Sequence, residues 1–202
     1  MRVFIIAMEC EADCVRPYLC AADKLIVCGI GKVNAAAAAQ RTISEYGAKA
    51  IINIGLAGGF AADMQPGDLR EVSAAVEYDF DLAKLNGTRI GQLDEYDTPY
   101  LDAATTGAFP AAILATGDHF NDSESDYRLI RDELGAGLRD MEGAAIAHVA
   151  KKVGVKFYSL KCVTNVAGKG AMTIQYEENK ARCLERLTVA TGEFLKAIGS
   201  PT

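Results

Sequence analysis

Short apolar runs alternate with helix-like segments along this chain, and this alternation constrains the fold more than any other feature. Such alternation is typical of a mainly parallel sheet that is covered by helices on both faces. We therefore expect an α/β fold with a mixed, mainly parallel sheet flanked by helices. The expected strands are residues 3–7, 25–28, 50–54, 69–76, 111–115 and 155–163, and the expected helices are residues 35–46, 125–134, 143–153 and 174–198.

The 202 residues show no internal repeat and no linker, so we expect one domain over residues 1–202 with a substantial buried core. The region 77–110 is irregular in pattern, with Asn86-Gly87 as a hairpin turn. A net charge of −6 without any basic run argues against a nucleic-acid partner. No apolar run reaches the length of about 18 residues that a membrane span needs.

The cysteine pattern favours free thiols over a metal site. None of the six cysteines forms a CxxC pair, and only His119 and His148 could add imidazole ligands. Cys10 and Cys14 have the i,i+4 spacing of a helical metal pair, but no second thiolate pair completes a site. We expect no metal and a reducing, cytoplasmic location, since the chain also enters its first strand without a signal-peptide layout.

Glycine-rich turns follow two of the expected strands. Gly29-Ile30-Gly31 follows residues 25–28, and a second glycine turn, Gly55 to Gly59, follows residues 50–54. The carboxyl ends of strands are where α/β sheets bind ligands, although tight connections alone would also use glycine. Neither turn is a dinucleotide or phosphate-loop motif, because the third glycine of GxGxxG and the first glycine of a Walker loop are missing.

An acidic pair precedes the expected helix at residues 143–153. Asp140 and Glu142 flank Met141, and small residues follow them. One interpretation is that the helix dipole stabilises two negative charges at its start. The other is a ligand site, in which Glu142 accepts hydrogen bonds from sugar hydroxyls while Met141 packs on the sugar.

These segments together resemble the purine nucleoside phosphorylase superfamily, and within it the hydrolase branch of 5'-methylthioadenosine/S-adenosylhomocysteine nucleosidases. The resemblance implies a nucleoside phosphorylase-like fold, a purine nucleoside as the small-molecule partner, no cofactor, and a homodimer that completes the 5' end of the pocket. The matching stretches follow the family's order and cover most of the chain: residues 7–11, 29–33, 53–59, 66–68, 116–118, 141–149 and 164–167.

The resemblance also implies roles for individual residues. Glu11 would activate the attacking water, and Asn165 lies where nucleosidases carry the aspartate that gives a proton to N7 of adenine. Glu142 would bind the 2'- and 3'-hydroxyls. The remaining expected substrate contacts are Met8, Ala57 and Gly58 along the substrate, Phe120 stacked on the purine, the Asn121 backbone at the base edge, Met141 under the ribose, and Lys161 in place of an arginine.

The expected chemistry suits these residue types. Breaking an N-glycosidic bond builds positive charge on the sugar and negative charge on the leaving base, so carboxylates near the sugar and a donor at the base both help. Asn165 has no acidic proton, but its amide matches a 6-oxopurine, as in trimeric purine phosphorylases. Futalosine hydrolases, which release hypoxanthine, also resemble this branch. We therefore expect a preference for 6-oxopurine nucleosides.

Three functions remain open at this point: a hydrolase, a phosphate-dependent phosphorylase and a nucleoside-binding relative without turnover. Residues 8–11 stand where the hexameric phosphorylases carry a phosphate loop, and their carboxylates would repel phosphate. Leu56 stands where nucleosidases have a serine and Asn165 where they have an aspartate, which favours the binder, whereas the retained Glu11 and Glu142 argue against it. Plainer roles also remain open: Glu11 as a solvated helix residue, Phe120 as core, Asn165 as a turn former and His148 as a structural residue.

Overall fold

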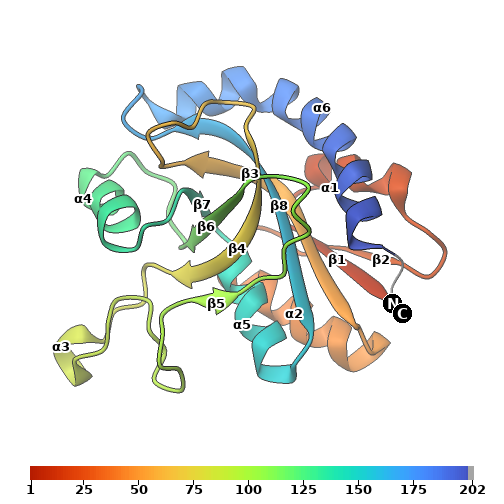
Figure 1. Ribbon diagram of the computed structural model, residues 1–202, viewed down its shortest axis with the longest axis horizontal. Helices are drawn as coiled ribbons and strands as arrows, with labels where there is room; N and C mark the ends of the chain where they lie inside the picture. Colours follow the sequence, from red (N-terminus) through yellow and green to blue (C-terminus); the bar gives the residue numbers. More distant parts are fainter. Residues whose placement is uncertain (200–202) are drawn as a thin grey trace.

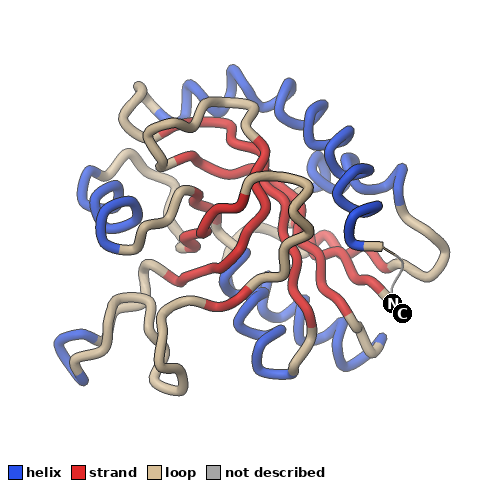
Figure 2. The backbone as a smooth tube through the Cα atoms, viewed as in Figure 1, coloured by secondary structure: helices blue, strands red, loops and turns tan. Residues whose placement is uncertain are grey.

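The computed structural model describes residues 1–199, and the last three residues of the expected domain lie outside the described part. A central sheet carries helices on both of its faces (Figure 1). Figure 2 shows the strands converging in the middle of the molecule with helices around them. The expected α/β fold with a mixed, mainly parallel sheet is confirmed.

The sheet contains eight strands in the described part of the chain, and five of them close into a ring. β3 pairs with both β7 and β8, and β4 pairs with both β6 and β8, while β6 pairs with β7. β1 and β2 extend the sheet from the outer edge of β3. The strands are β1 (Arg2–Ile6), β2 (Lys24–Val27), β3 (Ala50–Gly59), β4 (Leu69–Glu77), β5 (Leu101–Asp102), β6 (Ala111–Thr116), β7 (Leu138–Asp140) and β8 (Lys156–Val166).

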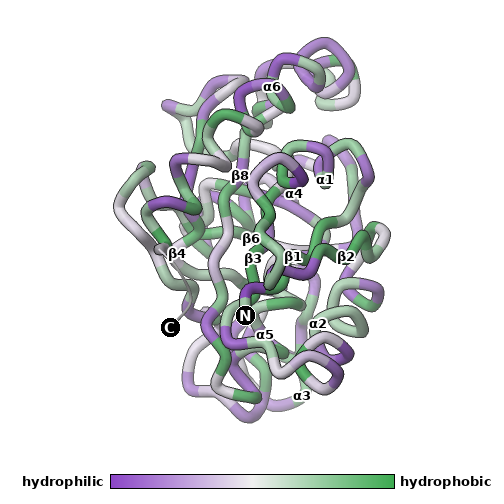
Figure 3. The backbone as a smooth tube through the Cα atoms, turned by 90° about the vertical axis from the view of Figure 1, so that its right-hand side faces the viewer, coloured by the Kyte–Doolittle hydropathy of each residue, from purple (hydrophilic) through white to green (hydrophobic). Residues whose placement is uncertain are grey.

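Four long or well-packed helices bury the two faces of the sheet. α1 (Glu9–Val15) and α6 (Met172–Ile198) cover one face, and α2 (Lys32–Tyr46) and α5 (Gly143–Val153) cover the other (Figure 1). Apolar residues gather on the central strands, as the green segments of Figure 3 show. Shorter turns are Arg16–Tyr18, α3 (Ala83–Asn86), α4 (Glu124–Arg128) and the π-helical turn Leu129–Glu133. No helix within residues 1–199 has both the length and the apolar character to cross a membrane.

β3 and β8 run further than the sequence pattern predicts. They pair in parallel from Ala50 and Lys156 to Gly59 and Val166, so the glycines expected to form a turn belong to β3 itself. A Cβ atom at Gly59 would lie 2.9 Å from Val163 Cγ1, so only glycine allows this approach. The extension closes the ring and brings the ends of both strands to the same cavity.

One other local prediction was wrong, and one short strand was missed. Asn86-Gly87 is no hairpin turn, because Asn86 ends α3 and Gly87, with φ of 76°, is its left-handed cap. Residues 138–140 form β7, a short strand that the sequence pattern did not predict, and α5 begins at Gly143 as expected.

Candidate active site

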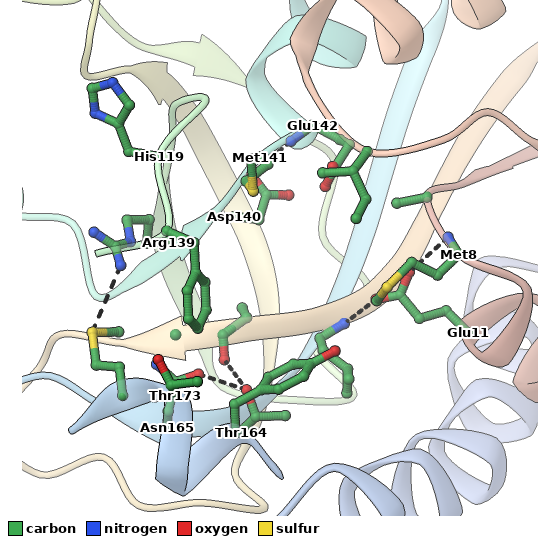
Figure 4. A pocket seen from close by; sticks show the side chains of 18 of the residues that line it. Met8, Glu11, His119, Arg139, Asp140, Met141, Glu142, Thr164, Asn165 and Thr173 are labelled. Atoms are coloured by element: carbon green, nitrogen blue, oxygen red, sulfur yellow. Dashed lines mark hydrogen bonds between the residues drawn. The ribbon is translucent and has the colours of Figure 1, made fainter. Parts of the chain in front are cut away.

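A cavity of about 310 Å³ opens at the carboxyl ends of β1, β7 and β8 and along the last residues of β3. This location agrees with the general position of ligand sites in α/β sheets. All the predicted site residues except Asn121 and Lys161 line it: Met8, Glu11, Ala57, Gly58, Phe120, Met141, Glu142 and Asn165. Figure 4 shows Glu11 and Met8 at one end of the cavity and Asn165 and Arg139 at the other.

Glu11 lies in the first turn of α1 but is only 4% exposed, which contradicts the solvated alternative. Its Oε1 accepts the N–H of Leu56 at 2.7 Å, and its Oε2 accepts the N–H of Met8 at 3.2 Å. Burial raises the pKa of Glu11, and the positive charge of Lys161 opposes this only in part. A buried carboxylate with a raised pKa at a cavity wall is suited to accept a proton from water near neutral pH.

Gly55 makes room for that carboxylate. A Cβ atom at this position would lie 2.6 Å from Glu11 Oε1. Real Cβ atoms do not approach an oxygen so closely, so the glycine is needed for the observed position of Glu11 rather than for a turn.

Lys161 does not line the cavity but lies beneath it. Its Nζ forms an ion pair with Asp140 Oδ2 at 2.8 Å, and both side chains are 2% exposed. Burial alone would lower the pKa of Lys161, but the carboxylates of Asp140, Glu142 and Glu11 outweigh it and raise that pKa. The structure therefore places Lys161 as a buried cation among three acids, not at the substrate contact that the resemblance implies.

Asp140 and Glu142 make different contacts. Asp140 caps α5, because its carboxylate accepts the N–H of Gly143 at 3.0 Å. Glu142 instead points across to Gly31, whose N–H it accepts at 2.9 Å through Oε1. Its Oε2 accepts no hydrogen bond from residues 1–199. Burial, with the nearby charge of Asp140, raises the pKa of Glu142 to about 7, although Lys161 acts in the opposite direction.

Asn165 lies inside β8, opposite Gly58, and is 1% exposed, so its role as a turn former is excluded. Its Oδ1 accepts the hydroxyl of Thr164 at 2.7 Å. Its Nδ2 is buried and has no hydrogen-bond partner within residues 1–199. Unpaired buried donors are rare because each costs about 1–3 kcal/mol, so this N–H group is a candidate ligand contact.

Phe120 is 51% exposed, which rules out the core alternative. Its ring meets the ring of Tyr176 edge-on, with centroids 6.0 Å apart and an angle of 72° between the planes. An exposed aromatic ring at a cavity wall is suited to stacking on a planar base.

Asn121 does not line this cavity, but it accepts hydrogen bonds from Arg139, which does. Its backbone oxygen accepts Arg139 Nη2 at 2.9 Å, and its Oδ1 accepts Arg139 Nη1 at 3.2 Å. Asn121 lines a neighbouring cavity of about 260 Å³. The predicted contact between its backbone and the base edge therefore has no counterpart at the wall of the main cavity.

Several cavity residues had no role in the sequence analysis. Arg139 lies in a three-residue strand that the sequence pattern did not predict, and Tyr176 and Thr173 belong to a long helix without any motif. Of the histidines, His119 lines the cavity, whereas His148 lies apart from it, 3.4 Å from Glu77. Within residues 1–199 no three His, Cys, Asp or Glu side chains are grouped to hold a metal ion.

Comparison with known proteins places this fold and cavity in a family. The model of the Phosphorylase superfamily matches residues 24–197, which is most of the chain. The chain belongs to the Phosphorylase superfamily, and the resemblance stated from its motifs is confirmed.

Its relatives within that family are nucleosidases, as the resemblance predicts. A 5'-methylthioadenosine/S-adenosylhomocysteine nucleosidase of Treponema pallidum is 30% identical over 212 residues, which cover 86% of this chain and 78% of that protein. An aminodeoxyfutalosine nucleosidase of Campylobacter jejuni is 30% identical over 153 residues, covering 70% and 67%. A structure of a candidate 5'-methylthioadenosine/S-adenosylhomocysteine nucleosidase from Borrelia burgdorferi, bound to adenine, is 25% identical with a TM-score of 0.86, covering 97% of this chain and 99% of that chain.

Proposed function

We propose that this protein is a purine nucleosidase, which hydrolyses the N-glycosidic bond of a purine nucleoside with water activated by Glu11. The observation that carries this proposal is the pairing of two buried groups across one cavity. Glu11 is a carboxylate with a raised pKa at one end, and at the other lies Asn165 Nδ2, which has no hydrogen-bond partner among the described residues (Figure 4). The nucleosidase names of the relatives point to the same class of reaction.

In this mechanism a water molecule attacks C1' of the ribose and gives its proton to Glu11. The C1'–N9 bond breaks, and its electron pair leaves with the base. Positive charge that develops on the sugar is stabilised by Glu11 and Glu142, and negative charge on the base is stabilised by the Asn165 N–H. Glu142 also accepts the 2'- and 3'-hydroxyls through Oε2, since Oε1 already accepts Gly31.

The charge of the cavity argues against a phosphorylase. Glu11, Asp140 and Glu142 line the cavity, and the buried cation Lys161 is already paired with Asp140. Phosphate placed there would face uncompensated carboxylates in a poorly solvated site. The binder alternative is weakened by the buried, hydrogen-bonded Glu11, because a protein that only binds has no need of a desolvated carboxylate at the sugar.

Assembly and location complete the proposal. The apolar side chains of Ile30 and Phe120 line the cavity yet are 52% and 51% exposed, and Val33 nearby on α2 is 80% exposed. A second copy of the chain covering these side chains would close the 5' end of the cavity, so we expect a homodimer. Light scattering that gives a monomer mass at micromolar concentration would contradict the dimer.

The cysteines support a cytoplasmic location. All six are free thiols, and thiols stay reduced in the cytoplasm.

The function is tested by base release in buffer without phosphate. A panel of purine nucleosides with 5'-hydroxyl and 5'-methylthio groups is incubated with the parent and with Glu11→Gln, and free base is measured by chromatography. The parent should release base without phosphate, and Glu11→Gln should be far slower. Release that requires phosphate would indicate a phosphorylase, and no release from any nucleoside would indicate a binder.

A further inference from the structure

The base end of the cavity carries a second hydrogen-bond donor besides Asn165. Arg139 lines the cavity, and its side chain is 4% exposed. Its guanidinium lies 5.0 Å from the centroid of the Phe60 ring and 3.9 Å from Asp126 Oδ2, so its charge is compensated. The two hydrogen bonds to Asn121 fix its direction.

Arg139 and Asn165 both lie beside Met172. Arg139 Nη2 lies 3.6 Å from Met172 Sδ. A Cβ atom built on Gly58 would lie 3.2 Å from both Met172 Cε and Asn165 Nδ2, so the same methionine also adjoins the asparagine. Figure 4 shows both polar side chains at the end of the cavity opposite Glu11.

Two side-chain donors, Asn165 Nδ2 and the Arg139 guanidinium, belong to residues that line this end of the cavity. A guanidinium offers five N–H groups and no acceptor. The acceptor of Asn165, Oδ1, already accepts the hydroxyl of Thr164, which leaves its Nδ2 donor for a ligand. A 6-oxopurine presents two acceptors on one edge, N7 and O6, whereas adenine presents the N7 acceptor beside an N6 donor.

We infer that Arg139 is a specificity-determining residue which, with Asn165, makes this cavity select a 6-oxopurine base through N7 and O6. The inference rests on the proposed nucleosidase function and names its substrate class. It sets the chain apart from the relatives named above, whose names refer to 5'-methylthioadenosine, S-adenosylhomocysteine and aminodeoxyfutalosine.

The donor pair also explains how the base leaves without an acid. When the C1'–N9 bond breaks, the electron pair spreads over the purine to N7 and O6. The amide N–H and the permanently charged guanidinium stabilise that negative charge without giving up a proton, and the released base takes its proton from solvent. An adenine base would gain no such contact at its N6 amino group, which instead meets a cation.

The test compares Arg139→Met and Arg139→Lys with the parent, and with Arg70→Met as a matched control. Arg70 is a partly buried arginine on β4 that pairs with Asp68 at 3.1 Å and does not line the cavity. The first readout is the ratio of kcat/KM for inosine to that for adenosine, repeated with their 5'-methylthio counterparts. The second is the ratio of Kd values for hypoxanthine and adenine by calorimetry, which needs no turnover.

We expect the parent and Arg70→Met to prefer the 6-oxopurine in both ratios, and Arg139→Met to lose that preference by on the order of 5- to 150-fold. Arg139→Lys keeps the positive charge but loses the planar set of guanidinium donors, so its preference should lie between those of the parent and Arg139→Met. A parent that prefers adenine, or a ratio unchanged in a folded Arg139→Met, would overturn the inference. Failure of hydrolysis with retained hypoxanthine selectivity would overturn the proposed function and leave the base preference standing.

Discussion

Replacing Glu142 by glutamine should make the protein more stable at pH 8 and less able to distinguish ribose from 2'-deoxyribose. The carboxylate is 7% exposed, and burial together with Asp140 raises its pKa to about 7. Ionising it in the folded protein therefore costs free energy. Glutamine keeps an oxygen that can accept the Gly31 N–H but carries no charge, so the variant avoids this cost.

The size of the effect follows from the two pKa values. The pKa of about 7 in the folded protein stands against an ordinary value of 4.5. This difference of roughly 2.5 units corresponds to about 3–4 kcal/mol, at about 1.4 kcal/mol per unit. Because the folded state holds the proton more tightly, this group lowers stability as the pH rises from about 4.5 to 7. The glutamine variant should not show that loss.

Urea denaturation at pH 5 and pH 8 measures the effect. The free energy of unfolding of the parent should fall between these pH values by roughly 2–3 kcal/mol more than that of Glu142→Gln. Glu45→Gln, which removes an exposed carboxylate on α2, is the control and should behave like the parent. The reasoning fails if Glu142→Gln is less stable than the parent at pH 8, or if both lose the same stability.

Catalysis supplies the second half of this prediction. A charged acceptor that binds both ribose hydroxyls is left short of a donor by a 2'-deoxy substrate. The parent should therefore turn over inosine faster than 2'-deoxyinosine, by about 10- to 150-fold for one hydrogen bond to a charged group. Equal kcat/KM values in the parent would show that Glu142 does not bind the ribose.

Three further substitutions test the remaining groups. Glu11→Gln should lower kcat by on the order of a hundredfold or more with substrate binding kept, as measured by initial rates and calorimetry, and unchanged turnover would remove Glu11 from the mechanism. Gly55→Ala should lower kcat with a folded circular dichroism spectrum, because its Cβ displaces the Glu11 carboxylate; full activity would show that the observed position of Glu11 does not matter. Asn165→Asp should shift the inosine-to-adenosine ratio of kcat/KM toward adenosine by a factor that corresponds to roughly 1–3 kcal/mol, and a ratio that stays constant would mean that Asn165 does not read the base.

The fold followed from the sequence where hydrophobic pattern and strand length agree. The buried runs of β1, β4 and β6 and the amphipathic α5 were predicted close to their observed bounds. Glycines misled the prediction at β3, because Gly55 and Gly59 are typical of turns but here serve close packing against Glu11 and Val163. The three residues of β7 were too few to show a period, and only their pairing with β3 and β6 makes them a strand.

The residues of the candidate site could be predicted where they belong to a sequence motif. Their roles were harder to predict where these depend on tertiary contacts. Glu11 and Asn165 come from segments far apart in the sequence, yet both line one cavity, as the resemblance of their motifs to the family implies. The sequence pattern could not show that Asp140 pairs with Lys161 or that Glu142 accepts the Gly31 N–H, because both contacts join distant segments of the chain. The direction of Arg139 was equally hidden, because it depends on two hydrogen bonds from a loop.

The central claim is that water, and not phosphate, attacks the sugar. The most direct measurement is the identity of the sugar product when the parent cleaves its best purine nucleoside in phosphate buffer, resolved by mass spectrometry. The proposed mechanism predicts free sugar as the only product, formed at the same rate with and without phosphate. A sugar 1-phosphate would contradict it.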